Sequence, residues 1–147
     1  MNYKEAVEKF HVFLNSINGD ITNIKISEDK WSLREILGHL IDSASNNHQR
    51  FVRLQFSDLM DFPAYEAEQW IRVQNYNSMN WELIVSLWYN YNCMLINLIE
   101  GIESDKLQNV WIKNEEAIPL EEIINHYYKH LEMHIEHFQN RLGELTI

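Results

Sequence analysis

Four stretches of this chain repeat apolar residues at the three- and four-residue spacing that gives an α-helix one buried face. They cover about residues 3–17, 32–59, 81–102 and 119–143. Ser32 and Glu35 begin the second stretch as a capping box, in which each side chain binds the other residue's free backbone amide. Pro119 suits the first turn of the last stretch, and Gly143 suits its end. These patterns predict four helices.

The breaks between these helices are short or polar, with one exception. Residues 60–80 are irregular and include Pro63, so we expect a long crossover loop that can lie over a site. Only four Gly and two Pro occur in 147 residues, which is few for the many reversals of an all-β domain. The expected fold is all-α, a four-helix bundle whose crossover loop joins the second and third helices. We expect one domain over residues 1–147, because the length suits one and no repeat divides it.

Charge and hydropathy exclude two classes of partner. The net charge of -10 makes nucleic acid and anionic membranes poor partners, because affinity for both comes from Lys and Arg. No apolar run approaches the roughly 20 residues that a membrane helix needs. The N-terminus also lacks the hydrophobic region of a signal peptide. We therefore expect a cytoplasmic protein that binds neither nucleic acid nor membrane.

Four of the seven histidines fall within the last predicted helix, at positions 126, 130, 134 and 137. At about 100° per residue they share one face, within ~80° of one another. They span roughly 16 Å along the axis, so one metal ion can bind only an adjacent pair. His130 and His134 lie closer to the apolar side than His126 does, and histidines four apart project in one direction. The pair His130 and His134 is therefore preferred.

A third ligand has to come from another helix, because two ligands rarely hold a metal tightly. His39, in the string ILGHLIDSASNNHQRF, is the leading candidate. It shares an edge of its helix with Asn47 and Arg50, whereas His48 points to nearly the opposite side. His39 also lies away from the centre of the helix's apolar arc, which predicts a position at a rim or in a pocket.

Three neutral imidazoles leave at least one coordination position open, as catalytic metal sites do. Imidazole binds zinc, nickel and iron alike, so the ligands do not identify the divalent ion. In the alternative interpretation, these histidines are half-buried helix residues that bond to their neighbours and hold no metal.

WSLREILGHLIDSASNNHQRFVRLQ at residues 31–55 and HYYKHLEMHIEHF at residues 126–138 resemble the DinB-like superfamily, in particular its YfiT-like branch of metal-dependent hydrolases. The resemblance implies a four-helix bundle, often dimeric, with three histidines at a metal. One lies early in the second helix and two lie four apart in the last helix. The matching positions here are His39, in the string HLID, and His130 with His134.

The resemblance also has a departure. His126 matches a histidine that precedes the ligand pair by one turn and is not itself a ligand. Beyond the last ligand the family pattern has a polar or small residue, whereas Ile135, Glu136 and His137 follow here. We therefore expect different surroundings for His134.

For activity, the resemblance implies a hydrolase or a transferase that acts through a low-molecular-weight thiol. We expect a small-molecule substrate, with such a thiol among the candidates, and a homodimer. Asn47 and Arg50 could hold an anionic group of the substrate, and Asp42 could orient His39. The alternative is that Arg50 and Asp42 lie on an exposed helix face, as charged residues usually do. No general base is identifiable.

A second functional hypothesis is a non-catalytic bundle that binds metal or pairs with itself. Trp88, Tyr89 and Tyr91 lie on different faces of the third predicted helix and would serve a dimer interface. The same aromatic residues could instead fill the core of a monomer.

Overall fold

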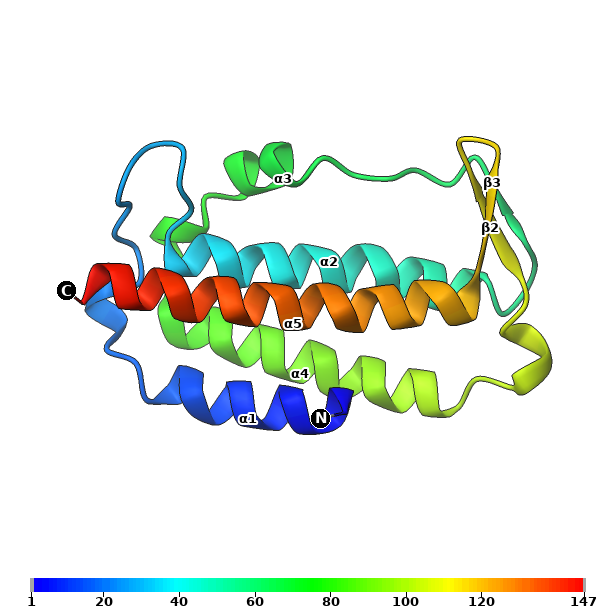
Figure 1. Ribbon diagram of the computed structural model, residues 1–147, viewed down its shortest axis with the longest axis horizontal. Coiled ribbons are helices and arrows are strands. Elements are labelled where there is room, and N and C mark those ends of the chain that lie inside the picture. Colours follow the sequence, from blue (N-terminus) through cyan, green and yellow to red (C-terminus); the bar gives the residue numbers. More distant parts are fainter. Residues whose placement is uncertain (1, 147) are drawn as a thin grey trace.

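The computed structural model describes residues 2–146 and is mainly a bundle of four long helices (Figure 1). These helices are α1 (Tyr3–Asn15), α2 (Leu33–Arg53), α4 (Trp81–Glu100) and α5 (Leu120–Leu145). Helix α2 packs against both α4 and α5, and α1 packs against α4 and α5. The predicted four-helix bundle is confirmed. No described helix is long and apolar enough to cross a membrane.

The predicted helix boundaries are correct at some ends and wrong at others. The capping box is present, because the Glu35 amide donates to Ser32 Oγ at 3.1 Å and the Ser32 amide donates to Glu35 Oε1 at 2.9 Å. The second helix ends at Arg53, however, and not near residue 59. The last helix continues through Gly143, whose φ is not positive, so this glycine does not act as a left-handed stop.

The segments outside the long helices contain structure that the sequence did not predict. The crossover between α2 and α4 carries the short helix α3 (Ala67–Gln74) and a 3-10 turn at Tyr76–Ser78. A small sheet combines β1 (Leu59–Met60), β2 (Val110–Lys113) and β3 (Glu116–Pro119). Strand β1 pairs in parallel with β2, which pairs antiparallel with β3. Figure 1 shows this hairpin at one end of the bundle, with the crossover running along α2 toward α3.

The core joins three helices through aromatic rings. Phe10 meets Trp88 and Phe138 edge to face, at centroid distances of 5.2 and 5.3 Å. Trp88 is wholly buried, while Tyr89 donates a hydrogen bond to Glu8 and Tyr91 pairs with His48. The aromatic residues assigned to a dimer interface or a monomer core thus make contacts within the chain. The homodimer stays a prediction.

We predict that Gly38→Ala and Gly143→Ala change the stability in opposite directions. A Cβ on Gly38 would overlap the Tyr76 ring, whereas a Cβ on Gly143 has no neighbour within 4 Å. Overpacking should lower the free energy of unfolding of Gly38→Ala by about 1–3 kcal/mol. Gly143→Ala should raise it by about 0.5–1 kcal/mol, the usual gain in a helix. Urea unfolding measures both, and equal stabilisation by the two substitutions would contradict the close approach.

Candidate metal centre

The three histidines predicted as ligands come together between α2 and α5. One candidate ligand nitrogen from each of His39, His130 and His134 lies within 4.8 Å of the other two. His39 Nε2 is 3.1 Å from His130 Nε2, and the His134 ring centroid is 4.5 Å from each of the other two. His48 lies elsewhere, since its Nδ1 faces the Tyr91 hydroxyl at 2.9 Å. The structure therefore brings together the three histidines that were proposed from the sequence as ligands.

The cluster is more buried than the sequence indicated. His39 is only 4% exposed, which excludes the rim, one of the two positions expected for this residue. The indole ring of Trp31, from the segment before α2, has its centroid 4.9 Å from that of His39 and covers it. The Arg141 guanidinium on α5 donates a hydrogen bond to the Trp31 carbonyl, which holds this cover against the last helix. The cover is thus a residue just before α2, and a residue far away in the sequence, Arg141, holds it in place.

Two of the three rings have a neighbour on Nδ1, which leaves Nε2 as the free ligand atom. His130 Nδ1 is 3.5 Å from Ser43 Oγ. His134 Nδ1 is 3.2 Å from His137 Nδ1. If His134 binds a metal through Nε2, its Nδ1–H must be the donor and neutral His137 the acceptor, because each neutral ring has one donor and one acceptor nitrogen. His137 is then the group that orients His134.

Burial keeps the cluster neutral at pH 7. Desolvation, followed by the neighbouring imidazoles, lowers the pKa of His39 to about 3 and that of His134 to about 4. Desolvation also lowers the pKa of His130, with a smaller contribution from His126. Metal ions bind neutral imidazole, so the protonation state fits the ligand role.

The donor set also fits a cation. If His39 and His130 both carry their proton on Nδ1, their Nε2 lone pairs face each other across 3.1 Å, an arrangement that a positive ion stabilises. His39 Nδ1 is buried and has no partner among residues 2–146. Three imidazole nitrogens of this kind suit zinc, nickel or iron and leave the choice among them open.

A cavity of about 330 Å³ opens beside the cluster. His130 belongs to both, because it also lines this cavity. Asn47 and Arg50, the two residues predicted to hold a substrate, line it as well. The other lining residues are Ser43, Ala64, Tyr65, Trp111, Lys113, Ile118, Glu122, Ile123, His126 and Tyr127. The cavity size is that of a small-molecule site.

Comparison with known proteins identifies a family and a similar solved structure. A family profile described as the DinB superfamily matches residues 2–138. The chain belongs to the DinB superfamily. It is similar in structure to YfiT from Bacillus subtilis, which is described as a probable metal-dependent hydrolase with an unusual four-helix bundle topology. The match has a TM-score of 0.77 and 17% sequence identity, and covers 96% of this chain and 86% of YfiT. The comparison with curated proteins gave no match.

In this DinB-superfamily chain, Asp42 and Arg50 are not on an exposed helix face. They are 1% and 5% exposed, so the alternative in which both lie on an exposed helix face is wrong. Asp42 Oδ1 accepts hydrogen bonds from the Tyr76 hydroxyl at 2.7 Å and from Gln74 Nε2 at 2.8 Å. Burial raises the pKa of Asp42, and these two hydrogen bonds oppose the rise.

No hydrogen bond joins Asp42 to His39 among the described residues. Each residue nevertheless keeps one buried atom without a partner among the described residues, Oδ2 of Asp42 and Nδ1 of His39, and the two residues are three positions apart on α2. An N–H and a carboxylate oxygen are complementary. This supports the prediction that Asp42 orients His39, which stays a prediction.

Several residues at the DinB-superfamily site were not singled out from the sequence. Trp31 covers the cluster, and Trp111 and Lys113 reach the cavity from β2. His137, by contrast, was among the residues expected to change the surroundings of His134, and the two rings are in contact. Trp111 and Lys113 had no such signal, because their position depends on the hairpin and its pairing with β1.

Proposed function

We propose that this member of the DinB superfamily is a metal-dependent hydrolase that acts on a small molecule in the cavity beside His130. One observation carries the proposal: the three-histidine cluster and the cavity share His130, so a group bound in the cavity can reach the cluster. The description of YfiT as a probable metal-dependent hydrolase agrees with it.

His39, His130 and His134 would hold the divalent ion. Such an ion supplies Lewis acidity, which lowers the pKa of water and so provides a nucleophile at neutral pH. Ser43 and His137 orient two of the rings, and Trp31 shields His39 from solvent. Asn47 Nδ2 donates to the Ser43 carbonyl at 2.9 Å, which fixes its side chain at the cavity wall.

Two other functions use the same residues. Transfer to a low-molecular-weight thiol would place a thiol where hydrolysis places water. A non-catalytic metal site would need all ligand positions filled by protein, as structural zinc sites have. The group of three histidines contains no fourth described ligand, and a cavity opens at His130. Both facts favour catalysis over a sealed structural site.

The test is a screen of zinc-, nickel- and iron-loaded protein. Proton release from a panel of esters and lactones and amine release from a panel of amides measure hydrolysis, and loss of free thiol in the presence of an electrophile measures transfer. His130→Ala should lose both bound metal and turnover, while His48→Ala should keep both. Turnover by thiol transfer alone would replace hydrolysis with the transferase function. Wild-type rates equal to those of His130→Ala in every assay would contradict the proposal that the protein is a metal-dependent enzyme.

We predict that His137→Leu weakens zinc binding about tenfold, the lower end of the effect of losing a group that orients a ligand. Without His137 Nδ1, the His134 ring loses the acceptor that fixes its tautomer. His126→Leu is the matched control on the same helix face, because His126 is not part of the three-histidine cluster. Competition with a fluorescent chelator measures both. Equal affinities for the two variants would show that His137 does not orient His134.

A further inference from the structure

Arg50 is a buried cation without an anionic partner. It is 5% exposed, and the ion pairs among residues 2–146 involve other residues. Its Nη1 donates to Asn47 Oδ1 at 3.3 Å and its Nη2 donates to the Pro63 carbonyl at 3.4 Å, both long hydrogen bonds. Its Nε is buried without a partner among the described residues. A guanidinium has five N–H donors, and hydrogen bonds to the described residues use two of them.

Burial of this charge is unfavourable as it stands. Desolvation lowers the pKa of Arg50, and the nearby Tyr65 opposes this only in part. Buried charges normally have a partner of opposite sign. The indole of Trp111, 4.3 Å from Arg50 Cζ, offers only a cation–π contact. No ion pair found among residues 2–146 joins a carboxylate to Arg50, although Glu122 lines the same cavity.

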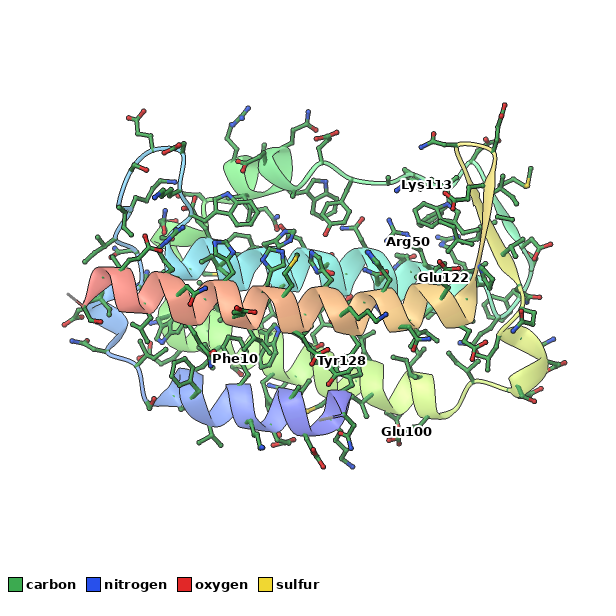
Figure 2. All side chains as sticks on the ribbon, in the orientation of Figure 1. Phe10, Arg50, Glu100, Lys113, Glu122 and Tyr128 are labelled. Atoms are coloured by element: carbon green, nitrogen blue, oxygen red, sulfur yellow. The ribbon has the colours of Figure 1, made fainter. Side chains whose placement is uncertain are left out.

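The free side of Arg50 belongs to the cavity. Arg50, Trp111 and Lys113 all line it, and Lys113 Nζ lies 5.3 Å from the centroid of the same indole. Figure 2 shows the labelled Arg50 and Lys113 near the hairpin end of α2 and α5, with Glu122 close to them. His130 lies on the wall shared with the histidine cluster. The cavity therefore joins a cationic region to the cluster.

We propose that the Arg50 region is a carboxylate subsite, and that the substrate is a small molecule whose carboxylate is separate from the group that reacts at the histidines. The carboxylate subsite does not depend on the proposed function, whereas the reaction at the histidines rests on it. A planar carboxylate accepts two parallel hydrogen bonds from a guanidinium. The Trp111 indole, itself 5% exposed, supports the guanidinium, and Lys113 adds a second positive charge at the rim.

A structural role for Arg50 is the competing explanation. Its hydrogen bond to Pro63 and its contact with Trp111 tie the crossover segment and β2 to the end of α2. Such a role would make Arg50 important for stability but indifferent to added anions. The experiment therefore has to measure anion binding in the folded protein.

The experiment is a titration of zinc-loaded protein with benzoate, followed by 15N NMR of the Trp111 indole N–H, which donates to the Phe62 carbonyl at 3.0 Å. The Trp111→Phe spectrum assigns the signal. Benzoate should shift it saturably, while benzyl alcohol, a neutral molecule of similar size, should not. Arg50→Gln should weaken benzoate binding at least about tenfold, as expected for a lost charge-assisted hydrogen bond. Arg53→Gln, which changes an exposed arginine about one turn along α2, should bind like wild type.

Lys113→Gln provides a second variant in case Arg50→Gln does not fold. Lys113 is exposed, so its substitution leaves the core intact and should weaken benzoate binding by a few-fold. Benzoate binding that is equal in wild type, Arg50→Gln and Lys113→Gln would overturn the subsite, because it would locate the ligand at the zinc. No shift with benzoate, an equal shift with benzyl alcohol, or tighter binding of inorganic phosphate would overturn it too.

These outcomes are separate from those of the proposed function. A benzoate response that depends on Arg50 in a protein without turnover would keep the carboxylate subsite and reject the hydrolase. Turnover that depends on His130, without recognition of benzoate, would do the reverse.

Discussion

Replacing His39 with alanine is expected to weaken zinc binding roughly a hundred- to a thousandfold. Zinc sites with about four protein ligands gain about 10–16 kcal/mol, or roughly 2.5–4 kcal/mol for each ligand, and about 1.4 kcal/mol is a factor of ten. His39 is the only one of the three clustered histidines on α2, so without it the two α5 histidines have no partner across the helix interface. Competition with a chelator of known affinity measures the loss.

His48→Ala is the matched control for this prediction. His48 lies on the same helix, is half-buried, and bonds to Tyr91 away from the cluster. Its removal should leave the zinc affinity unchanged. Loss of affinity in both variants would indicate a general effect of substitutions in α2, and no loss in His39→Ala would remove His39 from the site.

Acid is expected to destabilise the metal-free protein between pH 7 and pH 5. In the folded state the pKa of His39 is about 3 and that of His134 about 4, against an ordinary histidine value of 6.5, which represents the unfolded chain. Below pH 6.5 the unfolded chain therefore binds protons that the folded protein does not, so the free energy of unfolding falls as the pH falls. At about pH 5 each of the two histidines should contribute a loss of about 2 kcal/mol. The loss should level off below the folded pKa values.

Urea unfolding at about pH 7 and about pH 5, with the metal removed by a chelator, measures this loss. His39→Gln should reduce the difference between the two pH values by about 2 kcal/mol, because it removes one of the titrating groups. His48→Gln should not reduce it. A wild-type stability that is the same at both pH values would contradict the burial of neutral imidazoles in the cluster.

The parts of the structure that were predictable are those fixed by local periodicity. Apolar spacing gave the four long helices, and the three-residue interval between Ser32 and Glu35 gave the start of α2. The geometry of α5 put His130 and His134 on one face because residues four apart always share a face. His39 followed from its place on one edge of α2 and from the family resemblance.

The small sheet was not predictable, for an identifiable reason. Asn114 and Glu115 connect β2 to β3 with φ values of 51° and 68°. Two-residue hairpin turns of this kind usually carry Gly at the second position. Glutamate in its place removes the strongest local signal of a hairpin, and strands of two to four residues are too short to show alternation.

The burial of charged residues also could not be deduced from the sequence. The general rule places Asp and Arg at the surface, yet Asp42 and Arg50 are covered by the crossover segment and by β2. Tyr76, which binds Asp42, lies 34 positions away in the sequence. Such positions, where a local rule fails, are often functional. Here they lie beside the histidine cluster and in the cavity.

The most direct test of the three-histidine centre is X-ray absorption at the zinc edge of protein loaded with one equivalent of zinc. The structure predicts three imidazole nitrogens at about 2.0–2.1 Å and at least one oxygen from an exchangeable ligand. His130→Ala should lose this signature. A spectrum with four protein ligands, or zinc bound with fewer than three imidazoles, would contradict an open catalytic centre built from His39, His130 and His134.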